Sequence, residues 1–235
     1  MRTLLIGGQA CVFYGAAEFS RDLDLLVLAD PNSLELLRVA MAFLQAETIA
    51  IPELAPHYLD RGHAVHFRCQ LDDVRGLRID VMSKLRGTDD FDALWSRRTT
   101  IVARGVEVDL LSLRDLVKAK KTQRDKDWPM IRRLMEQASL LEGPGRDESH
   151  LEFLFLELRT PDLLITLAEE YPDVAIRISP ERPAVAAAIN RSVEDVEAAL
   201  ALEEASERKD DRAYWQPLRQ ELETLRRSRV RPSGE

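Results

Sequence analysis

Cysteine is scarce in this sequence, and no hydrophobic run is long enough to cross a membrane. The two cysteines, Cys11 and Cys69, have no metal-site spacing and can form at most one disulfide, so we expect reduced, buried thiols. No stretch of about 18 apolar residues occurs, and the opening MRTLLIGGQA lacks the long apolar core of a signal peptide. We therefore expect a cytoplasmic protein without a membrane segment.

The net charge of -8 comes from the C-terminal part of the chain. Residues 147–235 contain 20 acidic and 12 basic side chains, whereas residues 1–146 contain 21 of each. An acidic surface repels a phosphate backbone, so nonspecific nucleic-acid binding is not expected, and any such binding requires a local basic patch. With 235 residues, 45% of them hydrophobic, the chain can form one large domain or two modest ones.

The first part of the sequence alternates between strand-like and helix-like segments, which is typical of a mixed β-sheet with packed helices. Strands are expected at 3–8, 23–30, 63–70 and 76–83, the last two as a hairpin, with a further strand pair around Arg104 and Gly105. Helices are expected at 8–17, 31–46, 88–98 and 113–138. Asn32 and Ser33 are the expected caps of the second helix, and Pro129 predicts a helix boundary or kink near Asp127.

The best domain boundary is EGPGRDES, residues 142–149, which combines two glycines, a proline and four charges. Beyond it the sequence has helical periodicity, and Ser192 followed by Asp195 resembles a capping box. We therefore predict an α+β fold. A mixed-sheet domain with flanking and trailing helices is expected at 1–141, followed by a small acidic all-α module at 147–235.

Asp22 and Asp24 occupy alternate positions of a predicted strand. Side chains alternate between the faces of a strand, so both carboxylates lie on one face while Leu23 and Leu25 face the core. Two carboxylates this close repel each other unless a cation lies between them, and such oxygen ligands suit Mg²⁺ or Mn²⁺. A lone D-x-D pattern is equally typical of a solvated strand end or a helix cap.

A glycine pair and a third acid accompany these aspartates. Gly7 and Gly8 lie between a predicted strand and a short helix, where bare backbone N–H groups suit phosphate oxygens and where glycine also serves as an ordinary tight turn. Asp80 lies between Ile79 and Val81, so burial without a cation would be costly for its carboxylate. Asp109 has a similar setting, but we prefer Asp80 because its hairpin follows the first two strands.

This order of residues resembles the nucleotidyltransferase superfamily with the DNA polymerase β-like fold. Gly7 and Gly8 match its glycine signature, and Ser20, Asp22 and Asp24 match its [Ser/Thr]-x-Asp-x-Asp motif. The resemblance covers residues 3–137, and SLRDLVKAKKTQRDKD is similar to the lysine-rich helix of bacterial minimal nucleotidyltransferases and of type IV toxin-antitoxin toxins. It implies that the sheet domain is a nucleotidyltransferase domain.

The resemblance also implies a reaction and a set of roles. A nucleoside monophosphate would move from a nucleoside triphosphate such as ATP to a hydroxyl of RNA, protein or a small molecule, with release of pyrophosphate. Asp22, Asp24 and Asp80 would bind two Mg²⁺ or Mn²⁺ ions, and Asp80 would help to deprotonate the acceptor.

The remaining expected roles concern the phosphates of the nucleotide. Gly7, Gly8 and Ser20 would contact them, with a turn hydrogen bond as the alternative role of Ser20. Lys120, Lys121 and Arg124 are expected either to reach the phosphates from the neighbouring helix or to form a solvated face paired with Asp125 and Asp127.

Two positions depart from the pattern and leave alternatives open. Gly8 stands where many relatives have Ser, and Glu18 stands where many have Arg. The second candidate is therefore an inactive or weak nucleotidyltransferase-fold binding protein, such as an antitoxin or regulatory subunit, and the third is a structural domain with aspartate caps. Among enzymes we favour a toxin-antitoxin component with tRNA or a partner protein as acceptor and a cognate antitoxin or toxin as partner. An aminoglycoside-modifying enzyme is the further option.

Overall fold

The computed structural model of the chain describes residues 1–141 and 147–230. These residues form two compact units, which are described separately. Unit 1 contains Met1–Phe13, Ala17–Ala119 and the residues from Ala213 onward, and unit 2 contains Tyr14–Ala16 and Lys120–Arg212. The boundary expected at 142–146 lies outside the described residues, so a division into 1–141 and 147–235 stays a prediction.

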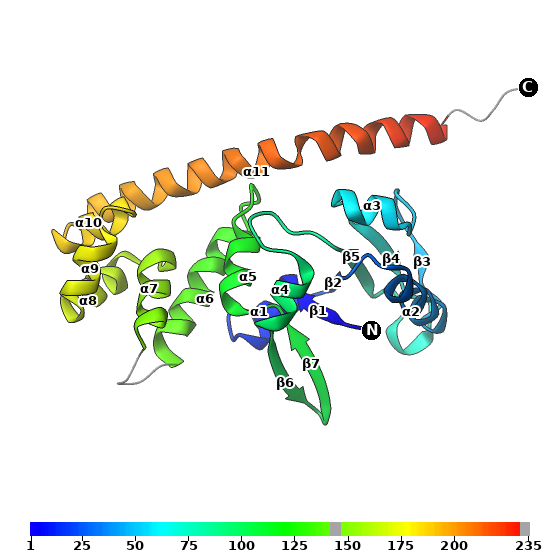
Figure 1. Cartoon of the computed structure of the whole chain (residues 1–235), viewed down its shortest axis with the longest axis horizontal. Coiled ribbons are helices and arrows are strands. Elements are labelled where there is room, and N and C mark those ends of the chain that lie inside the picture. The colour runs from blue at the N-terminus through cyan, green and yellow to red at the C-terminus, as the bar shows by residue number, and fades with distance from the viewer. Residues whose placement is uncertain (142–146, 231–235) are drawn as a thin grey trace, which may run out of the picture. The chain divides into compact units, whose positions relative to one another are not determined.

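Unit 1 is built on a seven-stranded mixed sheet (Figure 1). The strands are β1 (Thr3–Ile6), β2 (Asp22–Val27), β3 (Glu47–Thr48), β4 (Val65–Arg68), β5 (Arg78–Met82), β6 (Thr99–Ala103) and β7 (Val106–Leu110). Their order in the sheet is β3-β4-β5-β2-β1-β7-β6. The pairs β2–β5 and β1–β7 are parallel, and the other neighbours are antiparallel. The two predicted strand pairs, β4–β5 and β6–β7, are confirmed.

The helices of unit 1 connect these strands. They are α1 (Gly7–Phe13), α2 (Pro31–Phe43), α3 (Pro56–Arg61), α4 (Phe91–Ser96), α5 (Leu113–Lys120) and a 3₁₀ turn at Asp72–Val74. The predicted caps of α2 are wrong: the N-cap is Asp30, whose carboxylate accepts from the N–H groups of Asn32 at 2.9 Å and Ser33 at 3.2 Å. Pro31 takes the first helical position, so the residue before it becomes the cap.

One hydrophobic cluster of unit 1 lies on one face of the sheet, while Leu4 and Leu26 are buried on the other face. In the cluster, Val27, Val65, Phe67, Ile79 and Val81 are buried against the helices, which contribute Leu34, Leu37 and Met41 from α2 and Leu59 from α3. Burial of apolar surface stabilises this packing by about 25 cal/mol per Å². Because successive side chains alternate between faces, the same strands present their other residues to the opposite face.

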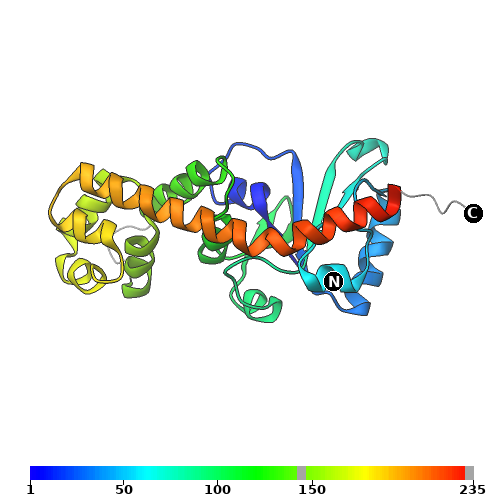
Figure 2. The ribbon, with the colours of Figure 1, turned by 90° about the horizontal axis from the view of Figure 1, so that it is seen from above.

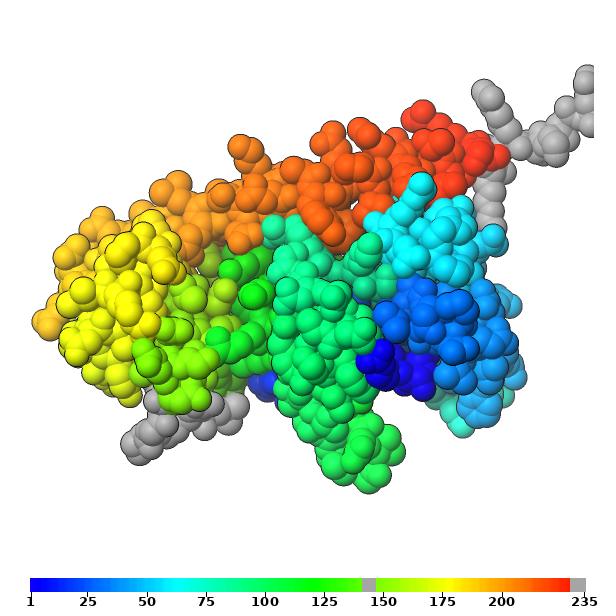
Figure 3. All heavy atoms as spheres, in the orientation of Figure 1, coloured from blue at the N-terminus to red at the C-terminus, as the bar shows by residue number. Residues whose placement is uncertain are grey.

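The second half of α11 (Val193–Val230) also belongs to unit 1. Glu221 forms an ion pair with Arg61 at the end of α3, and its carboxylate lies 3.2 Å from His63 Nε2. Trp215 and Leu218 lie over Gly62. Figure 3 shows the red end of α11 in contact with the cyan α3 segment.

Unit 2 is helical. It contains α6 (Asp127–Leu141), α7 (Glu148–Glu157), α8 (Pro161–Glu170), α9 (Pro172–Ile178), α10 (Pro183–Ile189) and the first part of α11. Figure 2 shows the yellow helices α8–α10 grouped beside the first turns of α11. The predicted start of a helix near Asp127 is confirmed, and Ser192 Oγ accepts from the Asp195 N–H at 3.2 Å, as the capping pattern indicates.

These elements confirm the predicted fold class: a mixed sheet with flanking helices, followed by a helical C-terminal part. Cys11 and Cys69 are buried and are not joined in a disulfide, as expected. In the described part of the chain, no helix has both the length and the apolar character that a membrane span requires.

Candidate functional site

The face of the sheet opposite this hydrophobic cluster carries the predicted acidic residues. On β2 the residues alternate, with Leu23, Leu25 and Val27 toward the cluster and Asp22 and Asp24 on the other face. Asp24 is the register partner of Asp80 on the parallel strand β5. Register partners in neighbouring strands point to the same face, with backbones about 4.8 Å apart. The structure therefore places three carboxylates on one face of two adjacent strands.

The glycine bend lies against this acidic face. Ile6, the last residue of β1, is the register partner of Asp24, so Gly7 follows directly beside that aspartate. Gly7 has a φ of +64°, and a β-carbon at this position would lie 1.9 Å from Asp24 Oδ2. The positive φ and the close approach both require glycine. The bend predicted from Gly7 and Gly8 and the acid pair are therefore neighbours in space.

Ser20 and Gly8 complete this corner of the site. A β-carbon at Gly8 would lie 2.5 Å from Ser20 Oγ, and the Gly8 N–H donates to Asp24 Oδ2 at 3.4 Å. Ser20 Oγ donates to the backbone carbonyl of Asp22 at 3.1 Å, which is the turn hydrogen bond considered above. Gln9 Nε2 donates to the Ser20 carbonyl at 3.0 Å. The loop before β2 is thus held onto the first turn of α1.

Asp80 is bonded to two side chains that the sequence analysis did not single out. Arg78 Nε donates to Asp80 Oδ1 at 2.7 Å, and His66 Nδ1 lies 2.8 Å from the same oxygen. Burial acts to raise the pKa of Asp80, but the hydrogen bonds and charges of His66 and Arg78 outweigh it and hold the pKa below its ordinary value. Asp80 is therefore an ionised, largely buried carboxylate.

Both missed residues carried a signal in the sequence. Arg78 precedes Asp80 by two residues, so strand alternation places their side chains on the same face. His66 becomes the partner of Asp80 once the β4–β5 hairpin register is known. The rival acid, Asp109, lies on β7, on the far side of β1 from β2, and is bonded to Arg98 and Thr100.

The donor set suits a divalent cation at part of this face. Asp22 and Asp24 are half-buried carboxylates on one strand, the oxygen chemistry that Mg²⁺ and Mn²⁺ prefer. Asp80 Oδ1, in contrast, is already occupied by Arg78 and His66. Among the residues that the structure describes, no group of three or more His, Cys, Asp or Glu side chains is arranged to hold a metal ion.

The predicted phosphate-binding cations belong to unit 2, whereas the carboxylates belong to unit 1. Lys120 is 8% exposed and lies 3.1 Å from Asp127, which also pairs with Arg124 at 2.7 Å. Lys121 pairs with Glu157 at 2.8 Å. Each of these cations thus has an acidic partner within its own unit. Their contact with phosphates stays a prediction.

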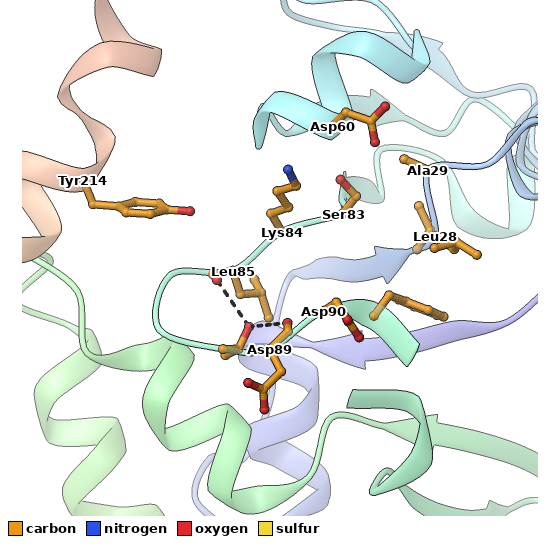
Figure 4. A pocket seen from close by; sticks show the side chains of 12 residues that line it. Leu28, Ala29, Asp60, Ser83, Lys84, Leu85, Asp89, Asp90 and Tyr214 are labelled. Atoms are coloured by element: carbon orange, nitrogen blue, oxygen red, sulfur yellow. Dashed lines mark hydrogen bonds between the residues drawn. The ribbon is translucent and has the colours of Figure 1, made fainter. Parts of the chain in front are cut away.

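A cleft of about 330 Å³ lies at the opposite end of β2 and β5 from Asp22 (Figure 4). Its lining includes Leu28 and Ala29 after β2, Lys84 after β5, Asp60 of α3 and Tyr214 of α11. The residues predicted to bind nucleotide or metal are not part of this lining. This cleft is therefore separate from the acidic face.

Comparisons with known proteins give distant likenesses among solved structures alone. No protein family model matches the sequence, and no curated protein matches it. Among solved structures, the chain is similar to the crystal structure of an antigenic nucleotidyltransferase-like protein from Paracoccidioides brasiliensis. The identity is 17%, the match covers 74% of this chain and 82% of that chain, and the TM-score is 0.37. A likeness this distant assigns neither family nor activity, so the function proposed below rests on the geometry of the site.

Proposed function

We propose that this chain is a divalent-metal-dependent nucleotidyltransferase that transfers a nucleoside monophosphate from a nucleoside triphosphate to a hydroxyl group. The observation that carries the proposal is the in-register placement of Asp22, Asp24 and Asp80 on one sheet face, directly beside the Gly7 bend. The sequence order of these residues resembles the superfamily, and their placement on one sheet face beside the glycine bend supports the proposal.

The proposed reaction forms one bond and breaks one. The acceptor oxygen bonds to the α-phosphorus, the bond from that phosphorus to the bridging oxygen breaks, and pyrophosphate leaves with the electron pair. Asp22 and Asp24 would hold the cation, which would neutralise charge on the phosphates and make the acceptor hydroxyl easier to deprotonate. Asp80 is the candidate base for the proton of the acceptor. Gly7, Gly8 and Ser20 line the corner where the phosphates would lie.

For the acceptor we propose a class of molecule. We favour RNA, in particular tRNA, or a partner protein, as in a toxin-antitoxin system, because residues 112–127 are similar to the lysine-rich helix of such enzymes. A small-molecule acceptor such as an aminoglycoside is the competing choice, since a cationic compound suits a chain of net charge -8.

Incubation with each α-labelled nucleoside triphosphate, Mg²⁺ or Mn²⁺, total tRNA and cell lysate tests the proposal. We expect label transfer that Asp22→Asn and Asp24→Asn each reduce at least a hundredfold, about 2.7 kcal/mol of transition-state stabilisation. Asp73→Asn is the matched control, because Asp73 is an exposed residue of the hairpin turn in the same unit. Circular dichroism checks that each variant is folded. Transfer that survives Asp22→Asn would refute the assignment of this site.

One observation favours the second candidate, a binding protein of this fold with weak or no catalysis. Asp80 is held by Arg78 and His66, and the Gly8 N–H donates to Asp24. A site in this state binds cations less readily than one with free carboxylates. This candidate predicts no incorporation of label with any acceptor, together with co-purification of a specific partner protein.

A further inference from the structure

We propose that Arg78 is the fixed cation of the acidic site, and that the nucleotide-free chain consequently binds one divalent cation where three free carboxylates would bind two. The proposal rests on the proposed function, because it assumes that the acidic face binds divalent cations. It assigns to Arg78 a positioning role, since the guanidinium holds Asp80 and does not react.

The contacts of Arg78 follow from its place in the sheet. Arg78 is the register partner of Asp22 on β2 and lies two residues before Asp80 on the same face of β5. Its Nε donates to Asp80 Oδ1 at 2.7 Å. The side chain of Asp80 is 13% exposed and that of Arg78 is 38% exposed. The guanidinium thus covers a nearly buried carboxylate from the solvent side of the sheet.

His66 contacts the same oxygen of Asp80 as Arg78 does, but its hydrogen bonds depend on the protonation of its ring. Its Nδ1 lies 2.8 Å from Asp80 Oδ1 and 3.1 Å from Arg78 Nη2. A guanidinium can only donate and an ionised carboxylate can only accept, so Nδ1 can bond to one of them at a time. The bond from Arg78 to Asp80 does not depend on the histidine tautomer. Arg78 is therefore the lasting partner of this oxygen.

The charge of Arg78 acts on all three acids. Arg78 is the register partner of Asp22, its Nε lies 2.7 Å from Asp80 Oδ1, and Asp80 is in turn the register partner of Asp24. Three carboxylates and one guanidinium leave two negative charges, which one divalent cation neutralises. A second divalent cation at Asp80 would lie against a fixed positive charge, and it could bind Oδ1 only by displacing a charge-assisted hydrogen bond.

Arg68 provides a matched comparison on the same face. It is the register partner of Arg78 on β4, at the next position away from the acids. It is exposed, and it makes no ion pair with any residue of the described ranges. Removing Arg68 therefore subtracts the same charge from the same sheet face without freeing a carboxylate.

Titration of the nucleotide-free full-length protein with Mn²⁺, followed by the loss of the electron paramagnetic resonance signal of free Mn²⁺, tests the proposal. We expect one bound Mn²⁺ per chain for the wild type, for Arg78→Lys and for Arg68→Ala. We expect two for Arg78→Ala, with the first ion bound at least tenfold more tightly because a nearby positive charge is gone. Arg78→Gln serves as a second neutral variant if Arg78→Ala does not fold.

The outcomes separate this proposal from the proposed function. Two Mn²⁺ ions bound by the wild type would overturn the role of Arg78 and leave the nucleotidyltransferase intact. Binding of one Mn²⁺ ion by folded Arg78→Ala or Arg78→Gln, with the affinity of the wild type, would likewise overturn the role of Arg78 and leave the nucleotidyltransferase proposal intact. Binding of no Mn²⁺ by the wild type would overturn both, and binding that survives Asp22→Asn together with Asp24→Asn would place the ion elsewhere and overturn both as well.

Discussion

Gly7 lies directly against the carboxylate of Asp24, so close that a β-carbon at Gly7 would be 1.9 Å from Oδ2 and 2.5 Å from Cγ. The contact follows from the β1–β2 register, in which the last residue of β1 faces Asp24. Any side chain at position 7 must therefore move either the bend or the acid. The glycine signature and the acidic motif are therefore in direct contact through Gly7 and Asp24.

Gly7→Ala is expected to lower both the stability of unit 1 and its affinity for Mn²⁺. The φ of +64° makes an alanine strained by about 1–2 kcal/mol, and the clash with Asp24 adds to this. We expect an at least tenfold loss of Mn²⁺ affinity, because the carboxylate is displaced. Urea unfolding measures the first effect, and Mn²⁺ titration measures the second.

Gly87→Ala is the control for that variant. Gly87 has a similar φ of +74°, but a β-carbon there would meet no atom within 4 Å. It should lower stability by the strain alone and leave Mn²⁺ affinity unchanged. Equal Mn²⁺ affinity in Gly7→Ala and Gly87→Ala would contradict the placement of the bend beside the acid.

Arg97→Ala is expected to destabilise unit 1 strongly. Arg97 donates to Asp115 from Nε at 2.6 Å and from Nη2 at 2.8 Å, and Asp115 is 1% exposed. Removal of the guanidinium leaves a buried carboxylate that still accepts a hydrogen bond from the Ser112 hydroxyl but has lost its cation, so the free energy of unfolding should fall by about 2–4 kcal/mol. Urea unfolding gives this value.

Arg38→Ala removes an ion pair from the surface of the same unit and should cost less than about 1 kcal/mol, since the Arg38 and Glu35 side chains are 50% and 69% exposed. If Arg97→Ala costs no more than Arg38→Ala, the buried pair with Asp115 does not exist in solution.

Asp127 predicts an acid-sensitive contribution to the stability of unit 2. It is 2% exposed and accepts from Thr122 at 2.6 Å, Arg124 at 2.7 Å and Lys120 at 3.1 Å. Burial raises its pKa, but the charges and hydrogen bonds of these residues outweigh it, so the folded pKa lies below the ordinary value of 3.8.

The direction of the pH effect follows from that lowered pKa. The contribution of Asp127 is fully present above its ordinary pKa and is lost as the pH falls through the folded pKa, because the unfolded chain takes up the proton first. Asp127→Asn should lower stability near neutral pH and make the decline below about pH 4 shallower than in the wild type. Urea unfolding over a pH series measures both curves. Parallel curves would mean that Asp127 is not ion paired when folded.

Glu203→Ala is expected to destabilise the helical part of unit 2. Glu203 bonds to Arg182 at 2.9 Å and 3.0 Å and to Arg159 at 3.2 Å, and both arginines are at least nine-tenths buried. Without the shared carboxylate, the buried Arg159 and Arg182 lose their common acidic partner, so the free energy of unfolding should fall by about 3–5 kcal/mol. Thermal unfolding of Glu203→Ala and of the surface control Glu169→Ala measures the difference, because Glu169 pairs with the exposed Arg191. A similar midpoint for both variants would refute the shared role.

Local patterns in the sequence were enough to predict most strands and helices of the sheet domain. The alternation of Asp22, Leu23, Asp24 and Leu25 predicts a strand with one apolar face, and β2 has that form. The hairpins β4–β5 and β6–β7 follow in the same way, because turn and alternation signals are contained within a few neighbouring residues. The cap of α2 was misplaced by two to three residues, because Pro31 takes the first helical position and Asp30 before it becomes the cap.

The sequence by itself therefore determined which residues alternate on each strand, where the glycine bend lies and which acids are available. Only the tertiary structure decided that β5 lies beside β2, so that Asp80 faces Asp24, while Asp109 lies across β1 and pairs with Arg98. It also decided that Arg78 and His66 bond to Asp80 and that Lys120 pairs with Asp127. The physical reason is that periodicity reports which face a side chain takes, whereas its neighbours across strands depend on the order in which distant segments pair.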